Sequence, residues 1–398
     1  MFPTIRHSET TEAVDSNVVD AAEAFDAPAP EAPAADEPSR RRRSFEALRK
    51  PVVRRRSHGR PAAGVTGLLL EQNEAIAVVA RQEGDHLVVQ RAAAADLPLG
   101  VVRDGEVIEP EALATPLKRL FAEHGLPKRV RVGIANQRTI MRTIDLPPLE
   151  RDAEITAAVR MHAPDHIAMP LDQALLDHQV LGRVETADGP RTRVVVVATD
   201  RESVDRLLEG LRRAGVRPEG LDLSAFALIR ALHGTAGKAA GPVLYAHVGG
   251  STTIAIAEGT DCRFTRVSPA GFDAFSAQLA ERAEVGLDEA RHRLIAAGAE
   301  GLSEDADARS VIALGAGVLG DDLRTSIEFY ASQWSGAVAE VVLTGTALAV
   351  PGFTDAVEKS IGLPVQAGEV GGSAEALGGL EPWRVAVAAG LSVEEVTA

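Results

Sequence analysis

Two stretches of this sequence follow the same plan, and that repetition narrows the possible folds more than any other feature. Each stretch opens with a strand hairpin, at 65–80 and at 242–258, and continues into helical patterns and further strands. Mixed strands and helices of this kind indicate an α/β fold. We therefore predict two lobes related by internal duplication, with a cleft between them where nucleotides commonly bind.

Changes in amino-acid composition along the chain indicate where the boundaries between its parts lie. Residues 21–38 alternate Ala, Pro, Glu and Asp with almost nothing to bury, which predicts disorder. Pro147 and Pro148 end the first strand of an inserted segment, and Asp200 is placed as the N-cap of its last helix. The expected parts are a disordered tail at 1–63, a first lobe at 64–140 completed by 216–235 and 382–398, an inserted α+β subdomain at 141–215, and a second lobe at 241–381.

Charge and composition exclude several functions. The net charge is −15, and residues 64–398 carry 31 Lys and Arg against 47 Asp and Glu. An acidic body repels the DNA backbone, so no nucleic-acid partner is expected. The single cysteine, Cys262, excludes a disulfide framework and a Cys-cluster zinc site. Neither a membrane-spanning apolar run nor a secretory signal is recognisable, which predicts a cytoplasmic chain.

The segment before the first lobe is strongly basic. Residues 40–63 carry ten Arg and Lys against one acid, Glu46. Such a segment attracts anionic lipid headgroups at about 1 kcal/mol per basic residue near a membrane. A solvated linker that pairs loosely with the acidic residues before it is the alternative, and both stay open.

Two glycine-containing strand ends are candidate phosphate loops. In VLYAHVGGSTT, a buried strand ends at Gly249 and Gly250, and hydroxyl residues follow. Backbone N–H groups of such a loop can cradle a phosphate, although Gly-Gly-Ser is also ordinary hairpin chemistry. In VVLTGTALAVPGF, Gly345 permits close approach of a ligand, although a plain strand-to-helix turn reads the same way.

Single reactive residues give weaker signals. His247 at a strand end is more typical of packed structure than of a catalytic base. Asp165 and His166 are neighbours that point in different directions, which suits a helix end better than a chelate. Cys262 lies in a turn with no evident base. We therefore predict no catalytic residue and no metal site.

The order and spacing of longer segments resemble a known family. The segments are RTIDLPPL (142–149), IAMPLDQALLDHQVLG (167–182), VVVVATDRESVDRLLEGLRRAGVRPEGLDLSAFALIRAL (194–232), HVGGSTT (247–253), FTRVSPAG (264–271), SIEFYASQ (326–333), LTGTALAVPGF (343–353) and RVAVAAGLS (384–392). In this joint order the chain resembles the PilM family of type IV pilus assembly proteins, within the actin-like ATPase superfamily, over residues 64–398.

The resemblance implies a two-lobed actin-like (ASKHA) fold with a small SHS2-like α+β insertion. It implies ATP in the cleft and, on the insertion side, the N-terminal cytoplasmic segment of PilN, an inner-membrane protein. It also implies a link to the pilus motor ATPases. The residues that would line a nucleotide site are Glu71, Gln72, Gly249, Gly250, Ser251, Thr252, Gly345 and Thr346.

The sequence departs from the family pattern where nucleotide chemistry would occur. Leu69 stands at the position of an acid that orients Mg²⁺-bound water, and Glu71 at the position of a glycine. A carboxylate ~4 Å from a triphosphate is unfavourable by about 1–4 kcal/mol. His247 replaces a second acid, and Gly345-Thr346-Ala347 replaces three glycines. We therefore expect Mg·ATP hydrolysis to be lost and no cofactor beyond weakly bound ATP.

The partner groove is the stronger functional expectation. We place it around the first strand and helix of the insertion, at Ile144, Leu146, Ile155 and Val159, although such positions also suit the core of the insertion itself. The sequence thus predicts a non-catalytic scaffold of type IV pilus or related secretion assembly. It would lie peripherally at the inner face of the cell membrane, held by a PilN-like protein and aided by its Arg-rich tail. The alternative is a genuine ATP-hydrolysing actin-like protein, as a division-type filament or a secretion-platform component.

Overall fold

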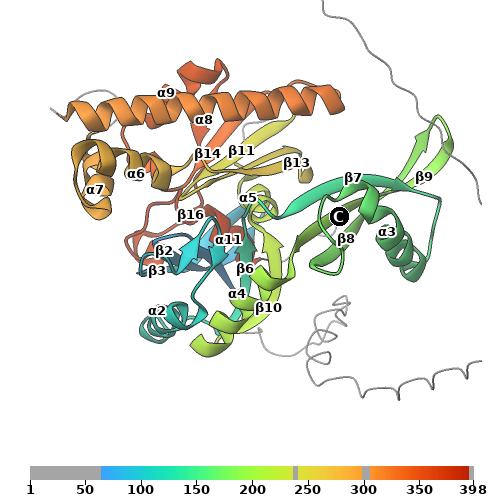
Figure 1. Cartoon of the computed structure of the whole chain (residues 1–398), viewed down its shortest axis with the longest axis horizontal. Coiled ribbons are helices and arrows are strands. Elements are labelled where there is room, and N and C mark those ends of the chain that lie inside the picture. Colours follow the sequence, from blue (N-terminus) through green and yellow to red (C-terminus); the bar gives the residue numbers. More distant parts are fainter. Residues whose placement is uncertain (1–63, 236–240, 298–304, 394–398) are drawn as a thin grey trace, which may run out of the picture. The chain divides into compact units, whose positions relative to one another are not determined.

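The computed structural model describes residues 64–235, 241–297 and 305–393. The expected tail at 1–63, with its Arg-rich segment, lies outside the described residues, as do the last residues of the expected first lobe. Within the described part, strands gather into two larger sheets and a three-stranded insertion sheet, with helices on their faces (Figure 1). This is a mixed α/β structure with two lobes, as the repeated plan predicts.

The sheet of the first lobe has three neighbouring parallel strands on one side. Its spatial order is β10 (Arg217–Leu223), β6 (Arg129–Ile134), β1 (Thr66–Leu70), β2 (Glu74–Glu83), β3 (His86–Asp96) and β16 (Gly371–Gly372). β6 runs parallel to both β1 and β10, so the carboxyl ends of these three strands lie at one edge of the sheet. β1, β2 and β3 form the antiparallel meander that the sequence predicts.

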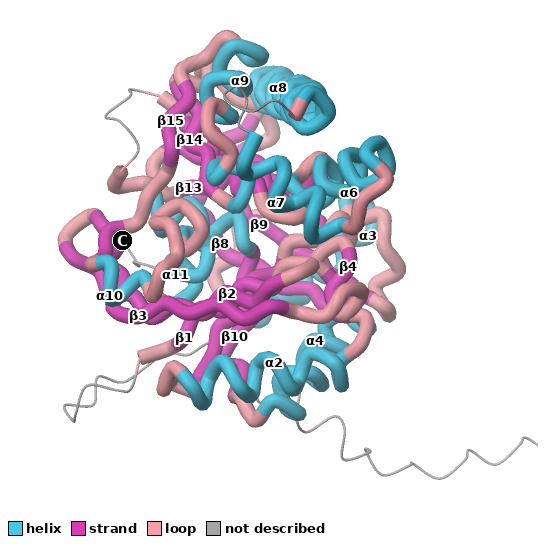
Figure 2. Tube along the Cα trace, turned by 90° about the vertical axis from the view of Figure 1, so that its left-hand side faces the viewer, coloured by secondary structure: helices cyan, strands magenta, loops and turns pink. Residues whose placement is uncertain are grey.

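Helices cover both faces of this first sheet. α2 (Pro110–Glu123) and α4 (Arg201–Ala214) pack on each other below it in Figure 2, whereas α11 (Ala386–Ser392) packs on β1 and β2. α2 begins with proline and buries Leu113, Leu117, Leu120 and Phe121, which confirms the apolar face expected for it. α4 begins directly after Asp200, whose side chain accepts from the Ser203 N–H as the predicted N-cap. The sequence placed α4 with the insertion, but the helix packs on α2.

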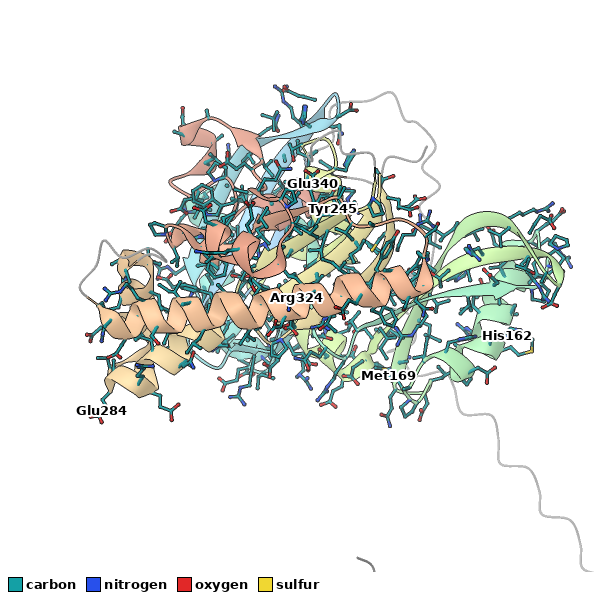
Figure 3. All side chains as sticks on the ribbon, turned by 90° about the horizontal axis from the view of Figure 1, so that it is seen from above. His162, Met169, Tyr245, Glu284, Arg324 and Glu340 are labelled. Atoms are coloured by element: carbon teal, nitrogen blue, oxygen red, sulfur yellow. The ribbon has the colours of Figure 1, made fainter. Side chains whose placement is uncertain are left out.

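The second lobe repeats the arrangement. Its sheet has the order β13 (Asp261–Ser268), β12 (Thr252–Glu258), β11 (Val243–Val248), β14 (Glu340–Thr344) and β15 (Val365–Ala367), with β11, β14 and β15 parallel. Its helices are α6 (Phe272–Ala283), α7 (Leu287–Ala297), α8 (Ala306–Gln333) and α9 (Phe353–Ile361), with the 3₁₀ turn η1 (Thr346–Ala349). Arg324, labelled on α8 in Figure 3, donates 2.6 Å to the Ser360 carbonyl of α9.

The insertion is a small sheet with one covering helix. β7 (Ile140–Leu146), β9 (Gly189–Asp200) and β8 (Ala174–Thr186) form the sheet in that order, and α3 (Asp152–His166) covers one face. His162 and Met169 in Figure 3 belong to this part. The core between helix and sheet contains Ile144, Leu146, Ile155 and Val159.

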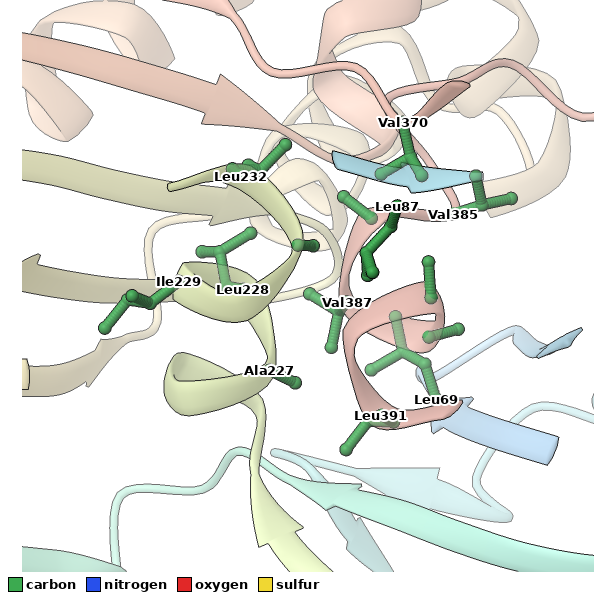
Figure 4. Packing of buried hydrophobic residues seen from close by; sticks show 14 of the residues in the cluster. Leu69, Leu87, Ala227, Leu228, Ile229, Leu232, Val370, Val385, Val387 and Leu391 are labelled. Atoms are coloured by element: carbon green, nitrogen blue, oxygen red, sulfur yellow. The ribbon is translucent and has the colours of Figure 1, made fainter. Parts of the chain in front are cut away.

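The two lobes share one core. Alternate residues of β11 point to opposite faces of its sheet. Leu244 and Ala246 pack under α6 and α8, whereas Val243 and Tyr245 face α5 (Ser224–Leu232) and α11. α5 and α11 bring Leu228, Leu232 and Val387 into the same cluster as Leu69 of β1 (Figure 4). His247 therefore points from the second lobe toward the first.

Two local expectations differ from the structure. The last helix was expected from Pro382 but begins at Ala386, because the Trp383 carbonyl accepts from the Gly345 N–H at 3.1 Å. A hairpin of β4 (Val102–Arg103) and β5 (Glu106–Val107) was not foreseen. Its turn, Asp104-Gly105, has positive φ at both residues, which is typical of a tight two-residue hairpin.

Candidate functional site

The predicted nucleotide-site residues lie at the carboxyl ends of parallel strands. Glu71 and Gln72 follow β1, whereas Gly249, Gly250 and Ser251 follow β11. Gly345 follows β14, and Thr346 begins η1. In open α/β sheets, this edge is where ligands bind. The fold thus brings β1 and β11, although they belong to different lobes, to one place.

The first two loops meet through a direct side-chain contact. The His247 Nε2 lies 3.2 Å from the Glu71 Oε1, and since a carboxylate only accepts, the imidazole N–H donates. The other ring nitrogen, Nδ1, lies 2.9 Å from the Thr344 hydroxyl, which orients the ring. The side chains of His247 and Glu71 are only 5% and 11% exposed. Two of the departures from the family pattern are therefore contact partners.

Both glycines of the second loop are covered by carboxylates. A Cβ added at Gly249 would lie 1.7 Å from the Glu71 Oε1. A Cβ added at Gly250 would lie 2.3 Å from the Asp273 Oδ2 of α6. Asp273 is itself bound by the Arg291 guanidinium of α7, which also lies 5.1 Å from the Phe272 ring centre. Only glycine leaves room for these two acids.

Burial and neighbouring charges shift the pKa values of the carboxylates in this cluster in opposite directions. Burial by itself raises the pKa of Glu71, but the hydrogen bond and charge of His247, with Arg291 and Arg384, bring it below its ordinary value of 4.5. Burial and the charge of Glu71 raise the pKa of Glu74, although Arg384 binds Glu74. Burial likewise raises the pKa of Asp273. Glu71 thus carries the buried negative charge that its cationic neighbours favour.

Sequence reasoning missed the surroundings of Glu71. Arg291 and Arg384 are far from Glu71 in the chain, and no local pattern marks them. The glycine pair was a signal of close approach, but the approaching groups in this structure are carboxylates of the chain itself.

The other residues that the sequence analysis singled out for a nucleotide site are mostly buried against other parts of the chain. Leu69 is 4% exposed and lies in the core shared by the two lobes. The Thr252 hydroxyl donates to the Ala270 carbonyl. Gly345 has φ +99°, and Thr346 is buried beside it. Gln72 and Ser251 are half-buried.

The predicted groove residues are all inside the insertion. Ile144, Leu146, Ile155 and Val159 are each no more than 5% exposed. Their side chains form the core between α3 and the sheet, so a partner could reach them only through neighbouring side chains.

A pocket opens beside the insertion, at the carboxyl ends of β1, β6 and β10. Its wall is formed by Leu69, Leu70, Val102, Gly105, Val107, Gly133, Ile134, Ala135, Asn136, Ser203, Val204, Leu207 and Ser224. Most of these side chains are apolar. The Ser224 hydroxyl at the start of α5 is buried without a hydrogen-bond partner in the described structure. With about 20 Å³ of open space and a mostly apolar wall, the pocket has room for a small apolar group.

The weaker candidates gain little from the structure. Among the described residues, no group of three or more His, Cys, Asp or Glu could hold a metal ion. Burial raises the pKa of the Cys262 thiol to about 12, so the thiol is inert. No helix in the described part of the chain is long and apolar enough to cross a membrane.

Comparisons with known proteins bear on the family and the fold. Residues 67–370 match the family described as type IV pilus assembly protein PilM. A solved structure of a PilM-PilN type IV pilus biogenesis complex is 25% identical, with a TM-score of 0.71 over 83% of this chain and 98% of that one. The ethanolamine utilization protein EutJ from Carboxydothermus hydrogenoformans is 15% identical, with a TM-score of 0.50 over 84% and 90%, which speaks for the fold alone. No curated protein matches the chain.

Proposed function

The chain belongs to the PilM family of type IV pilus assembly proteins, and we propose that it is a non-catalytic scaffold that holds the N-terminal cytoplasmic segment of a PilN-like inner-membrane protein. The actin-like two-lobed fold expected from the sequence is confirmed. The observation that carries the proposal is the likeness, over nearly the whole length of the other chain, to a PilM-PilN complex.

The pocket beside the insertion is our candidate for the partner site. It lies where ligands bind in open α/β sheets, at the ends of β1, β6 and β10. An apolar side chain of an extended segment would contact Leu70, Ile134 and Leu207. A backbone group of that segment would satisfy the Ser224 hydroxyl, which is otherwise an unfavourable buried polar group.

The non-catalytic part of the proposal rests on two side chains. Leu69 lies in an apolar core and its own side chain supplies no carboxylate for Mg²⁺-bound water. The carboxylate of Glu71 lies against Gly249, where a phosphate would need to approach. Both features disfavour the binding of Mg·ATP, and no observation favours the ATP-hydrolysing alternative.

The wider role follows from the same premise. A scaffold that holds a PilN-like segment would lie at the inner face of the cell membrane without crossing it. It would connect that membrane protein to the pilus motor ATPases. The Arg-rich segment at 40–63 would add attraction to anionic lipids.

The test is a peptide titration. N-terminal peptides of PilN-like membrane proteins encoded near this chain would be titrated against the full chain by calorimetry, with an expected dissociation constant on the order of 1 μM. Ala135→Arg places a long charged side chain in the pocket wall and should weaken binding by about tenfold or more. The matched control is Ala153→Arg on the exposed side of α3, which should bind normally.

Two results would count against the proposal. Equal binding by Ala135→Arg and the wild-type chain would move the partner site elsewhere. Absence of binding to every such peptide, together with phosphate release from Mg·ATP, would favour the ATP-hydrolysing alternative.

A further inference from the structure

Two changes from the family pattern have occurred together in space. At the end of β1 an acid, Glu71, stands where the resemblance expects glycine. At the end of β11 a base, His247, stands where it expects an acid. The structure joins the two residues at 3.2 Å across the lobes. The acid therefore stands on the other loop, and an imidazole N–H donor faces it.

The surroundings of the Glu71 carboxylate at Gly249 and His247, which we call its seat, have the properties of an anion-binding site. Its Oε1 lies on the open face of Gly249, close enough that a Cβ there would lie 1.7 Å away. The imidazole N–H of His247 donates to the same oxygen. Arg291 and Arg384 add positive charge around it, while they also bind Asp273 and Glu74. A fixed donor and nearby cations are features that bind free oxyanions. Gly249 contributes room, because its own N–H donates to the Ser251 carbonyl.

We propose that Glu71 is a built-in anion that fills the glycine loop at Gly249 in place of a free phosphate and so fastens the two lobes together without a ligand. The carboxylate is carried by the first lobe, whereas its seat belongs to the second. This contact between the lobes then needs no bound ligand. This inference does not depend on the partner segment and would stand if peptide binding failed.

The alternative is that Glu71 and His247 form an ordinary salt bridge, without a binding site that a free anion could fill. Exposed pairs are held loosely and are screened by salt. Here both side chains are nearly buried, and the ring of His247 is held from behind by Thr344. A site shaped in this way should accept another small anion once its own carboxylate is removed.

The experiment is anion rescue of Glu71→Gly in the full chain. Thermal unfolding would be followed while sodium acetate or sodium phosphate is added, with sodium chloride at matched ionic strength as the reference. The variant should unfold at a lower temperature than the wild-type chain. Acetate or phosphate should raise its Tm by a few degrees in a saturable way, and chloride should not, because binding to the folded state alone stabilises it.

Two controls keep the result specific. The wild-type chain should show no saturable response, because its seat is filled. Glu83→Gly removes an acid from the exposed end of β2 and should also show none. If Glu71→Gly does not fold, Glu71→Asp is used in the same titration. Its shorter side chain should not reach the position that the Glu71 carboxylate occupies beside Gly249. A folded variant without a saturable anion response, or the same phosphate response in the wild-type chain, would overturn the inference.

Discussion

A methyl group at Gly249 would test the contact between the two lobes most directly. Gly249 has no positive φ, so alanine causes no backbone strain there. Its Cβ would instead lie 1.7 Å from the Glu71 Oε1 and 2.7 Å from the Cδ. Gly249→Ala therefore has to expel the carboxylate, which separates Glu71 from His247.

The expected loss of stability follows from the burial of this pair. A hydrogen bond to a charged group contributes about 1.5–3 kcal/mol. Because the Glu71 side chain is 11% exposed and can turn toward solvent, we expect Gly249→Ala to destabilise the chain by about 2–3 kcal/mol through the loss of this hydrogen bond. In a Glu71→Ala background the seat is empty, and the same change should cost less than about 0.5 kcal/mol.

The assay is a double-mutant cycle by urea unfolding, followed by tryptophan fluorescence. Trp383 reports on this region, since its carbonyl accepts from the Gly345 N–H. Gly286→Ala is the matched control, because a Cβ there meets nothing within 4 Å. A coupling free energy of about 2 kcal/mol or more is expected. Equal costs of Gly249→Ala in both backgrounds would refute the reasoning.

Two further predictions concern stability elsewhere. Asp305→Ala removes the N-cap of α8 and a partner of Arg293, so it should cost about 1–2 kcal/mol at pH 7 by urea unfolding. Because the pKa of Asp305 is lowered from 3.8 to about 2 by these hydrogen bonds, the difference from the wild-type chain should shrink as the pH falls through that range; a pH-independent difference would contradict it. Gly105→Ala should cost more than about 1 kcal/mol in thermal unfolding, because Gly105 has φ +74° and a Cβ would lie 1.9 Å from the Ala135 carbonyl oxygen. An unchanged Tm would show that the β4–β5 turn can yield.

Local signals predicted many elements correctly. The apolar face of α2 and the Asp200 cap of α4 follow from periodicity and from the chemistry of one residue. The β4–β5 hairpin escaped notice because two-residue strands carry no periodic pattern. The packing of α4 on α2 could not be predicted either, since an amphipathic helix does not specify which neighbour covers it.

The candidate site was predictable only in pieces. The unusual residues Glu71 and His247 could each be recognised in the sequence, but they were interpreted as two unrelated departures from the family's nucleotide-binding pattern. Their contact spans 176 positions of chain and depends on how the two lobes pack. The groove residues were expected near the partner, yet they are buried in the core of the insertion, so our candidate partner site is the neighbouring pocket.

What the amino-acid order determined by itself was the class of fold and the family, because periodicity, turn residues and motif order are properties of consecutive residues. Which side chains meet was decided only in three dimensions. The alternation of β11 turns His247 toward the first lobe, and the shared core of α5 and α11 brings β1 opposite it. That packing converts two isolated substitutions into one buried pair.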